Sequence, residues 1–329
     1  MKRLPAALAL IAVAIPAMAA EIKPAVLYDL GGKFDKSFNE SVHDGAEAFR
    51  KRTGIAVREF EPQNDSQREQ ALRDFARRGA DPIIAVGFSQ ESAVTTVAKE
   101  FPKTRFVLID SVVDLPNVQS VLFREEQGSY LAGVLAALKT GTGKLGFVGG
   151  MDVPLIRKFA CGYAQGAKAA KPGTEVLQNM TGSTGAAWND PVRGGELARS
   201  QIERGVDIVF QAAGATGIGV LQAAADAGKL GIGVDSDQDS LHPGHMLTSV
   251  VKRVDVATER ALAAAQDGSW KPGVETLGLA DDGVALAFDS ENSPLIDQAQ
   301  REQVEQAKQG IISGQIKVHD YTADQKCPA

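Results

Sequence analysis

Residues 81–110 read DPIIAVGFSQESAVTTVAKEFPKTRFVLID. Compact apolar runs over 82–86 and 105–109 flank residues 91–100, whose apolar side chains recur at helical spacing. A short buried strand, a helix and a second buried strand in this order form the unit from which parallel sheets are built. This stretch therefore predicts a parallel α/β sheet.

The same alternation continues outward in both directions. Strand and helix candidates follow one another from residue 25 to residue 123, and a second series runs from residue 124 to residue 249. About 310 residues remain after removal of a signal peptide, which exceeds the size at which one hydrophobic core usually stops growing. No low-complexity linker separates the two series, so several short crossings are expected rather than one tether. We predict two doubly wound parallel-sheet lobes joined by a multi-strand hinge.

The expected division of the chain follows from these two series. It comprises a signal peptide at 1–20, an N-terminal lobe at 21–123 plus about 250–275, a C-terminal lobe at 124–249 plus about 276–322, and a tail at 323–329. The expected helices include residues 43–53, 220–227 and 293–313, and one expected strand covers 207–210.

The N-terminus has the layout of a secretory signal peptide. Lys2 and Arg3 precede an apolar run over 4–20, and Ala17 and Ala19 occupy the small-residue positions of a cleavage site. The run is short for a transmembrane helix, and two prolines interrupt it. Because no cysteine lies near the expected cut, we expect cleavage without lipid attachment.

The composition is that of an ordinary globular chain, with 44% hydrophobic residues, 23% charged residues and a net charge of −6. This acidic balance argues against nucleic acid or anionic lipid as a partner. The four histidines are scattered without a zinc-like spacing, so no metal site is expected. Cys161 and Cys327 leave two alternatives open, a disulfide in an oxidising compartment or two separate thiols.

Three aspartates, Asp29, Asp110 and Asp235, come at or just beyond the ends of expected strands. Ligands of open parallel sheets bind beyond the carboxyl ends of the strands. An ionised carboxylate accepts two hydrogen bonds side by side, which suits vicinal sugar hydroxyls or the N–H groups of a heterocycle. Each aspartate alone also suits a loop or a helix N-cap, but their shared position favours a binding site.

Aromatic side chains near the expected loops and strand ends offer stacking surfaces for a planar ligand. They are Phe34, Phe38, Phe88, Phe159, Phe210 and Trp188. Stacking of a base on such a ring contributes about 1–3 kcal/mol. A core position is the stronger interpretation for Phe88 and Phe159, and it is weakest for Phe38, which lies among polar residues.

Sequence motifs of catalysis are missing. The glycines of 214–219 resemble a phosphate loop but lack the lysine of that motif and an uninterrupted G-x-G-x-x-G register, so a close-packed turn is the better interpretation. The chain has no G-x-S-x-G and no H-E-x-x-H. We therefore expect neither a cofactor nor an enzymatic activity.

Five stretches, taken together and in this order, resemble the basic membrane protein family, the purine-nucleoside-binding proteins of ABC transporters. They are GGKFDKSFN at 31–39, FREEQGSYLAG at 123–133, AAGATG at 212–217, GVDSDQ at 233–238 and TSVVKR at 248–253. The resemblance implies a type I periplasmic-binding-protein fold. It also implies capture of a nucleoside such as guanosine, inosine or adenosine for a membrane permease and its ATPase.

The same resemblance implies ligand-binding roles for nine residues. Phe38 and Phe210 resemble the two plates that sandwich the base, Asp29 and Asn39 the groups at the base edge, Asp110, Asp235 and Lys252 the ribose-binding group, with Gly214 and Trp188 beside the cleft. Lys252 is identified by the resemblance alone. Many family members carry a lipid-modified cysteine at the mature N-terminus, whereas this sequence does not, so we expect a free periplasmic protein. We also expect it to be a monomer.

Two alternatives to a nucleoside receptor stay open. Aspartate pairs also suit sugars, so a receptor of the same fold for a sugar or another small polar solute is the second hypothesis. A nucleoside-hydrolysing enzyme is the third, but it would need clustered aspartates around a metal, and the aspartates here lie on separate strands.

Overall fold

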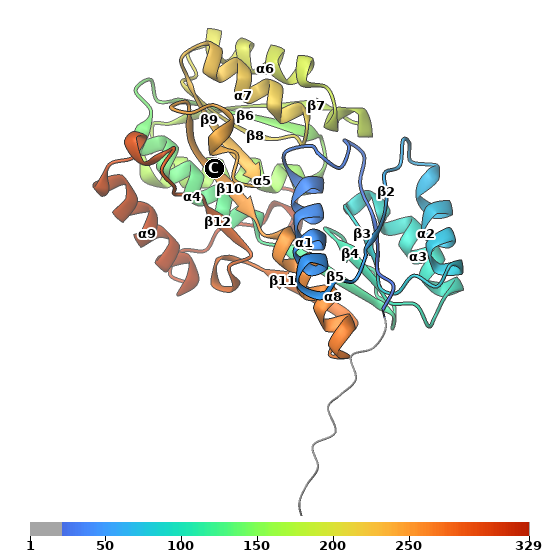
Figure 1. The fold of residues 1–329 in the computed structure, drawn as a ribbon. Coiled ribbons are helices and arrows are strands. Elements are labelled where there is room, and N and C mark those ends of the chain that lie inside the picture. Colours follow the sequence, from blue (N-terminus) through green and yellow to red (C-terminus); the bar gives the residue numbers. More distant parts are fainter. Residues whose placement is uncertain (1–21, 329) are drawn as a thin grey trace, which may run out of the picture.

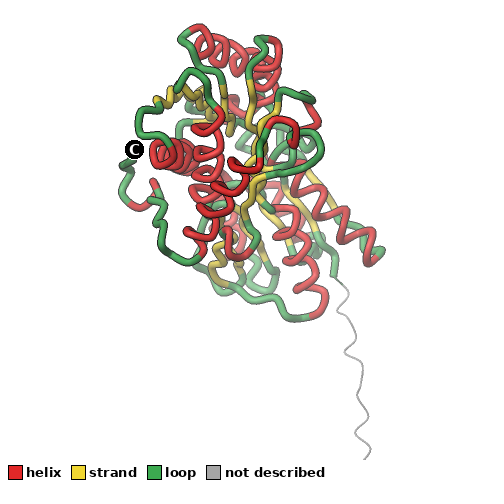
Figure 2. The backbone as a smooth tube through the Cα atoms, turned by 90° about the vertical axis from the view of Figure 1, so that its left-hand side faces the viewer, coloured by secondary structure: helices red, strands yellow, loops and turns green. Residues whose placement is uncertain are grey.

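The computed structural model describes residues 22–328 and shows two six-stranded sheets (Figure 1). Figure 2, turned by 90°, shows the strands of the sheets lying between helices. The expected signal peptide at 1–20 lies outside the described residues. Within 22–328, no helix is long and apolar enough to cross a bilayer.

The first sheet has the order β11-β5-β4-β3-β1-β2, and all its pairings are parallel. Alternate strand residues point to opposite faces, so Val26 joins the core under α1 and α8 whereas Leu27 joins the core under α2 and α3. The elements are β1 (Ala25–Leu27), α1 (Phe38–Thr53), β2 (Arg58–Phe60), α2 (Gln67–Arg77), β3 (Ile83–Ala85), α3 (Glu91–Glu100), β4 (Phe106–Ile109), β5 (Val118–Phe123), α8 (Val254–Asp267) and β11 (Gly273–Leu277).

The second sheet has the order β12-β10-β9-β8-β6-β7, with β12 as its one antiparallel strand. Helices α4 and α5 pack against each other, as do α6 and α7. The elements are α4 (Glu125–Lys139), β6 (Lys144–Met151), α5 (Pro154–Ala170), β7 (Glu175–Gly182), α6 (Pro191–Glu203), β8 (Ile208–Ala212), α7 (Thr216–Asp226), β9 (Leu230–Asp235), β10 (Met246–Lys252), β12 (Val284–Leu286) and α9 (Gln298–Ile312).

The described chain crosses between the two sheets three times, at Arg124, at Arg253 and over 278–283. The crossings are bonded to one another, because Arg124 N donates to Leu277 O and Arg253 N donates to Gly283 O. In Figure 1 the orange α8 and β11 lie with the blue and teal elements of the first lobe. The predicted pair of doubly wound lobes with a multi-strand hinge is confirmed, and we propose these crossings as the lobe boundaries.

Three expected helix starts are wrong. Helix α1 begins at Phe38 rather than residue 43, because the Asp35 carboxylate accepts the backbone N–H groups of Ser37, Asn39 and Glu40. Helix α7 begins at Thr216 rather than residue 220. The last long helix begins at Gln298, where Asp297 and Gln300 form a capping box, and residues 293–295 form a separate short turn.

Cys161 and Cys327 form a disulfide with a Cα–Cα distance of 5.6 Å. This resolves the two alternatives that the sequence left open. The bond joins the middle of α5 to the C-terminal segment, which is also hydrogen-bonded to α5 through Gln165 and His319.

Candidate functional site

A cavity lies between the two lobes at the carboxyl ends of their strands. It encloses about 580 Å³, including the part that opens to solvent. Asp29 follows β1, Asp110 follows β4 and Asp235 ends β9, and all three line the cavity. The structure therefore brings the three strand-end carboxylates to one place.

Eight of the nine residues singled out from the sequence line this cavity. They are Asp29, Phe38, Asn39, Asp110, Trp188, Gly214, Asp235 and Lys252. Trp188 packs closely on the strand β6, where a Cβ on Gly150 would come within 2.2 Å of its ring. The absence of a side chain at Gly150 therefore makes room for the indole at the cavity wall.

The prediction that Phe210 lines the cavity is wrong. Its side chain is fully buried, and its ring lies 5.4 Å from that of Phe147 and 5.2 Å from that of Tyr163. Strand β8 continues to Ala212 instead of ending at residue 210, so Ala212 and Ala213 occupy the cavity edge. Phe210 is consequently a core residue one strand repeat below that edge.

Phe88 and Phe159, for which the sequence favoured a core position, both line the cavity. Phe159 is also a buried member of the hydrophobic core, as the sequence predicted. Phe88 directly follows Gly87 at the end of β3, a strand end already marked by the sequence. Phe159 lies on α5, and no local pattern separates it from the other buried residues of that helix. Its position depends on how α5 packs across the lobe.

The carboxylate of Asp29 is held by several groups around it. Its Oδ1 lies 2.7 Å from Nη1 of Arg68 and accepts the backbone N–H of Leu30 at 2.7 Å. Ser89 Oγ donates at 2.8 Å to Oδ1 and at 2.9 Å to Oδ2. Gly87 leaves room for this carboxylate, because a Cβ there would lie 2.2 Å from Oδ2. Burial raises the pKa of Asp29, and Arg68 opposes that rise.

Asn39, the second residue of α1, binds the preceding loop with its side-chain amide. Its Oδ1 accepts the backbone N–H of Asp29 at 3.0 Å, and its Nδ2 donates to the carbonyl of Gly32 at 3.2 Å. In this structure the amide therefore fixes the backbone that carries Asp29. Direct bonding of Asn39 to a ligand stays a prediction.

Lys252 is the centre of a buried ion cluster. Its Nζ lies 2.6 Å from Asp110 Oδ2 and 2.9 Å from Glu125 Oε1, and the side chain is 2% exposed. Burial raises the pKa of Asp110 to about 6, although Lys252 favours its charged form. Burial alone would lower the pKa of Lys252, but Asp110 and Glu125 raise it above its usual value.

Glu125 extends this cluster to a second lysine. Its Oε2 lies 2.8 Å from Nζ of Lys158, which also donates to the carbonyl of Phe123 at 2.7 Å. Burial favours the neutral form of Glu125, but Lys158 and Lys252 lower its pKa to about 2. Sequence reasoning missed both Glu125 and Lys158, although Glu125 lies in the family-like stretch at 123–133.

Hydrogen bonds join the two lobes beside the cavity. Ser37 Oγ donates to Asp235 Oδ2 at 2.5 Å, and Ser236 Oγ donates to the carbonyl of Ser37 at 3.1 Å. Gln238 Nε2 donates to the carbonyl of Lys36 at 2.7 Å. These bonds join residues about 200 positions apart in sequence, so the described conformation is the closed one.

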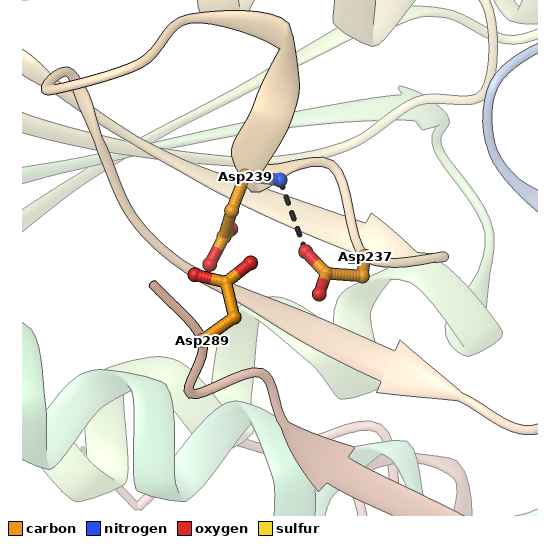
Figure 3. Close-up of side chains that lie close together, drawn as sticks. All are labelled: Asp237, Asp239 and Asp289. Carbon is orange, nitrogen blue, oxygen red and sulfur yellow. Dashed lines mark hydrogen bonds between the residues drawn. The ribbon is translucent and has the colours of Figure 1, made fainter. Parts of the chain in front are cut away.

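A separate group of carboxylates lies in the second lobe. Figure 3 shows the side chains of Asp237, Asp239 and Asp289 close together. One carboxylate oxygen from each residue lies within 4.8 Å of the other two. Both oxygens of the buried Asp239 are already bonded, one to Ser249 Oγ at 2.7 Å and the other to Asn292 Nδ2 at 2.6 Å. The group thus ties β10 to the segment that follows β12.

The comparisons with known proteins indicate a family of ABC transporter substrate-binding proteins. The family described as "ABC transporter substrate-binding protein PnrA-like" matches residues 22–322. The ABC transporter nucleoside-binding protein BmpA of Lactococcus lactis is 32% identical over 321 residues, covering 91% of this chain and 89% of the relative. An uncharacterized lipoprotein of Pyrococcus abyssi is 35% identical, covering 81% of this chain and 69% of that protein.

Solved structures agree on the fold. An ABC transporter solute-binding protein from Aeropyrum pernix has a TM-score of 0.84 and 29% identity, covering 91% of this chain and 94% of that one. One from Conexibacter woesei, 24% identical with a TM-score of 0.74, covers 92% and 99%. The expected periplasmic-binding-protein fold is confirmed.

Proposed function

Because the chain belongs to the PnrA-like family of ABC transporter substrate-binding proteins, we propose that it captures a purine nucleoside between its lobes and delivers it to a membrane permease. The observation that carries this proposal is the cavity itself. Its wall combines carboxylates from both lobes with the rings of Phe38, Phe88, Phe159 and Trp188. A nucleoside offers a flat base for the rings and hydroxyl and N–H donors for the carboxylates.

The corrected aromatic pair also fits a planar ligand. Phe38 comes from the first lobe and Phe159 from α5 of the second, and both line the cavity. Their ring centres lie 5.0 Å and 6.0 Å from the same atom, Nζ of Lys252. We propose that Phe159 takes the role that the sequence assigned to Phe210, so that one ring from each lobe contacts the base.

The charges favour a neutral nucleoside over a nucleotide. Four carboxylates line the cavity, those of Asp29, Asp35, Asp110 and Asp235, whereas Lys252 is the one basic side chain among the described lining residues. A phosphate would meet net negative charge at close range in a poorly solvated site. Ribose hydroxyls and base N–H groups instead donate to these acceptors.

A ligand held by both lobes also explains closure. Contacts with Asp29 and Phe38 on one side and Trp188 and Asp235 on the other exist together only when the lobes are closed. The ligand therefore favours the closed state by its differential affinity for it. The permease then has a single conformation to recognise.

Melting experiments test the nucleoside class directly. Guanosine, inosine or adenosine should raise the melting temperature, since a ligand at 100 times its Kd stabilises by about 2.7 kcal/mol. Guanosine 5′-monophosphate and ribose serve as controls and should shift the melt less. No shift with any of the three nucleosides at millimolar concentration would refute the proposal.

The substitution Phe38→Ala separates a base ligand from a sugar. Loss of one stacking face should weaken nucleoside binding by about 1–3 kcal/mol, or about 5- to 150-fold in Kd by titration calorimetry. Phe34→Ala is the matched control, because Phe34 lies in the loop just before Phe38 but is 63% exposed and packs on His43. If Phe38→Ala and Phe34→Ala bind alike, the ligand is a non-planar solute such as a sugar.

We further propose that the protein acts in the periplasm as a free monomer, with the permease and ATPase complex as its partner and without altering its ligand. Some relatives are named as lipoproteins, so the proposed lack of a lipid anchor needs a direct test. The intact mass of the exported protein should match a chain cleaved near residue 20 without lipid. Chromatography of nucleoside after incubation should recover it unchanged, whereas free base would indicate hydrolysis.

A further inference from the structure

Arg68 lies on α2, behind the cavity wall rather than in it, and is 4% exposed. Its guanidinium bridges two carboxylates. Nη1 is 2.7 Å from Oδ1 of the cavity residue Asp29, and Nη2 is 2.8 Å from Oδ1 of the surface residue Asp65. Burial of a cation is unfavourable unless the cation is paired, so these two carboxylates stabilise Arg68 in its buried position.

The two oxygens of Asp29 differ in how fully they are used. Oδ1 contacts Arg68, Ser89 and the backbone of Leu30. Oδ2 accepts a hydrogen bond from Ser89 at 2.9 Å and keeps acceptor capacity, because a carboxylate oxygen has two lone pairs. Contacts on one oxygen orient the group and leave the other for a donor in the cavity.

We propose that Arg68 is a positioning residue that keeps Asp29 ionised and fixed in direction, so that the site recognises the N–H or O–H donors of its solute at this end. The identity of the solute rests on the proposed function, whereas the state of Asp29 does not. Arg68 would thus determine specificity without touching the ligand.

The surrounding charges support this assignment. Arg68 is the cation in contact with Asp29. Burial raises the pKa of Asp29, and Arg68 opposes that rise more than the hydrogen bonds from Leu30 and Ser89 do. The remaining charged residues of the cavity are engaged elsewhere, since Asp35 binds backbone N–H groups of α1, Asp235 accepts from Ser37, and Lys252 pairs with Asp110. Removal of the Arg68 charge should therefore leave Asp29 protonated over a wider pH range.

The variant Arg68→Gln tests this, with Arg73→Gln as the matched control. Arg73 lies on the same helix and pairs with Glu69 and Glu100, away from the cavity. The titration of Asp29 is followed in the ligand-free proteins by the ¹³Cγ signal of labelled aspartate, assigned with Asp29→Asn. We expect Arg68→Gln to titrate at higher pH than the parent protein and Arg73→Gln to match the parent.

Binding of inosine gives the second measurement, at pH 6, 7 and 8. For each unit by which the solution pH lies below the pKa of Asp29, the ionised fraction of Asp29 falls about tenfold. The Kd of Arg68→Gln should therefore weaken progressively from pH 8 to pH 6, more steeply than that of the parent protein. If Arg68→Gln folds poorly, Arg68→Lys serves as the second variant. It keeps the positive charge and should retain most of the affinity of the parent protein.

The outcomes separate this inference from the proposed function. An Asp29 titration that is the same in the parent and Arg68→Gln would overturn the inference, as would a loss of affinity that is equal at all three pH values. If the parent protein does not bind inosine, the proposed function fails, and the titration of Asp29 still decides the role of Arg68.

Discussion

Lys252→Met is expected to abolish nucleoside binding and to lower the free energy of unfolding by about 3–5 kcal/mol. The side chain is 2% exposed, and its ammonium lies between Asp110 and Glu125, whose side chains are also buried. Without it, Asp110 loses its partner, and only Lys158 remains beside Glu125. A buried carboxylate left without a cation costs several kcal/mol. Urea unfolding and titration calorimetry measure the two effects.

Two further variants separate stability from binding. Lys36→Met is the control, because that lysine is half exposed and pairs with Glu40 on the surface, so its loss should change unfolding by less than about 0.5 kcal/mol. The double variant Lys252→Met with Asp110→Asn should regain part of the lost stability but not the binding. A single Lys252→Met variant that unfolds like the parent protein and still binds would contradict this interpretation of the ion cluster.

Removal of the disulfide by Cys161→Ala together with Cys327→Ala is expected to lower the free energy of unfolding by about 2–5 kcal/mol. The bond closes a loop with a sequence separation of 166, which constrains the unfolded chain strongly. The free energy of nucleoside binding should change less than the free energy of unfolding, because the hydrogen bonds between Gln165 and His319 still hold the C-terminal segment on α5.

The measurement is urea unfolding of the double variant, compared with the parent protein in oxidised and reduced form. The reduced parent protein should behave like the variant. Superimposable curves for the oxidised parent and the variant would show that the bond adds nothing to stability.

Local signals in the sequence located most elements of the fold. Helix α3 begins and ends where the sequence predicts. Helix α8 stops at Gly268, which adopts the left-handed conformation that glycine favours. The start of α1 was harder to predict, because it depends on the Asp35 carboxylate binding three backbone N–H groups. Such a contact is visible only once the loop is folded.

The candidate site was predictable where it follows from strand ends and failed where it depends on packing. Asp110 and Asp235 could be placed because strand ends meet at one edge of a sheet. Phe210 was misplaced by two residues of strand β8, and Phe159 reaches the cavity only through the packing of α5. Arg68 gave no signal, because charged residues are common on an exposed helix and its partner Asp29 lies 39 positions earlier.

Native mass spectrometry of the protein purified without added ligand, before and after addition of guanosine, inosine and adenosine, tests the central claim most directly. The closed cavity should hold one molecule per chain, with the mass of a purine nucleoside, either retained from purification or taken up from the mixture. Release under denaturing conditions should return that nucleoside intact. A chain that keeps a hexose, or that stays unoccupied with all three nucleosides in excess, would contradict it.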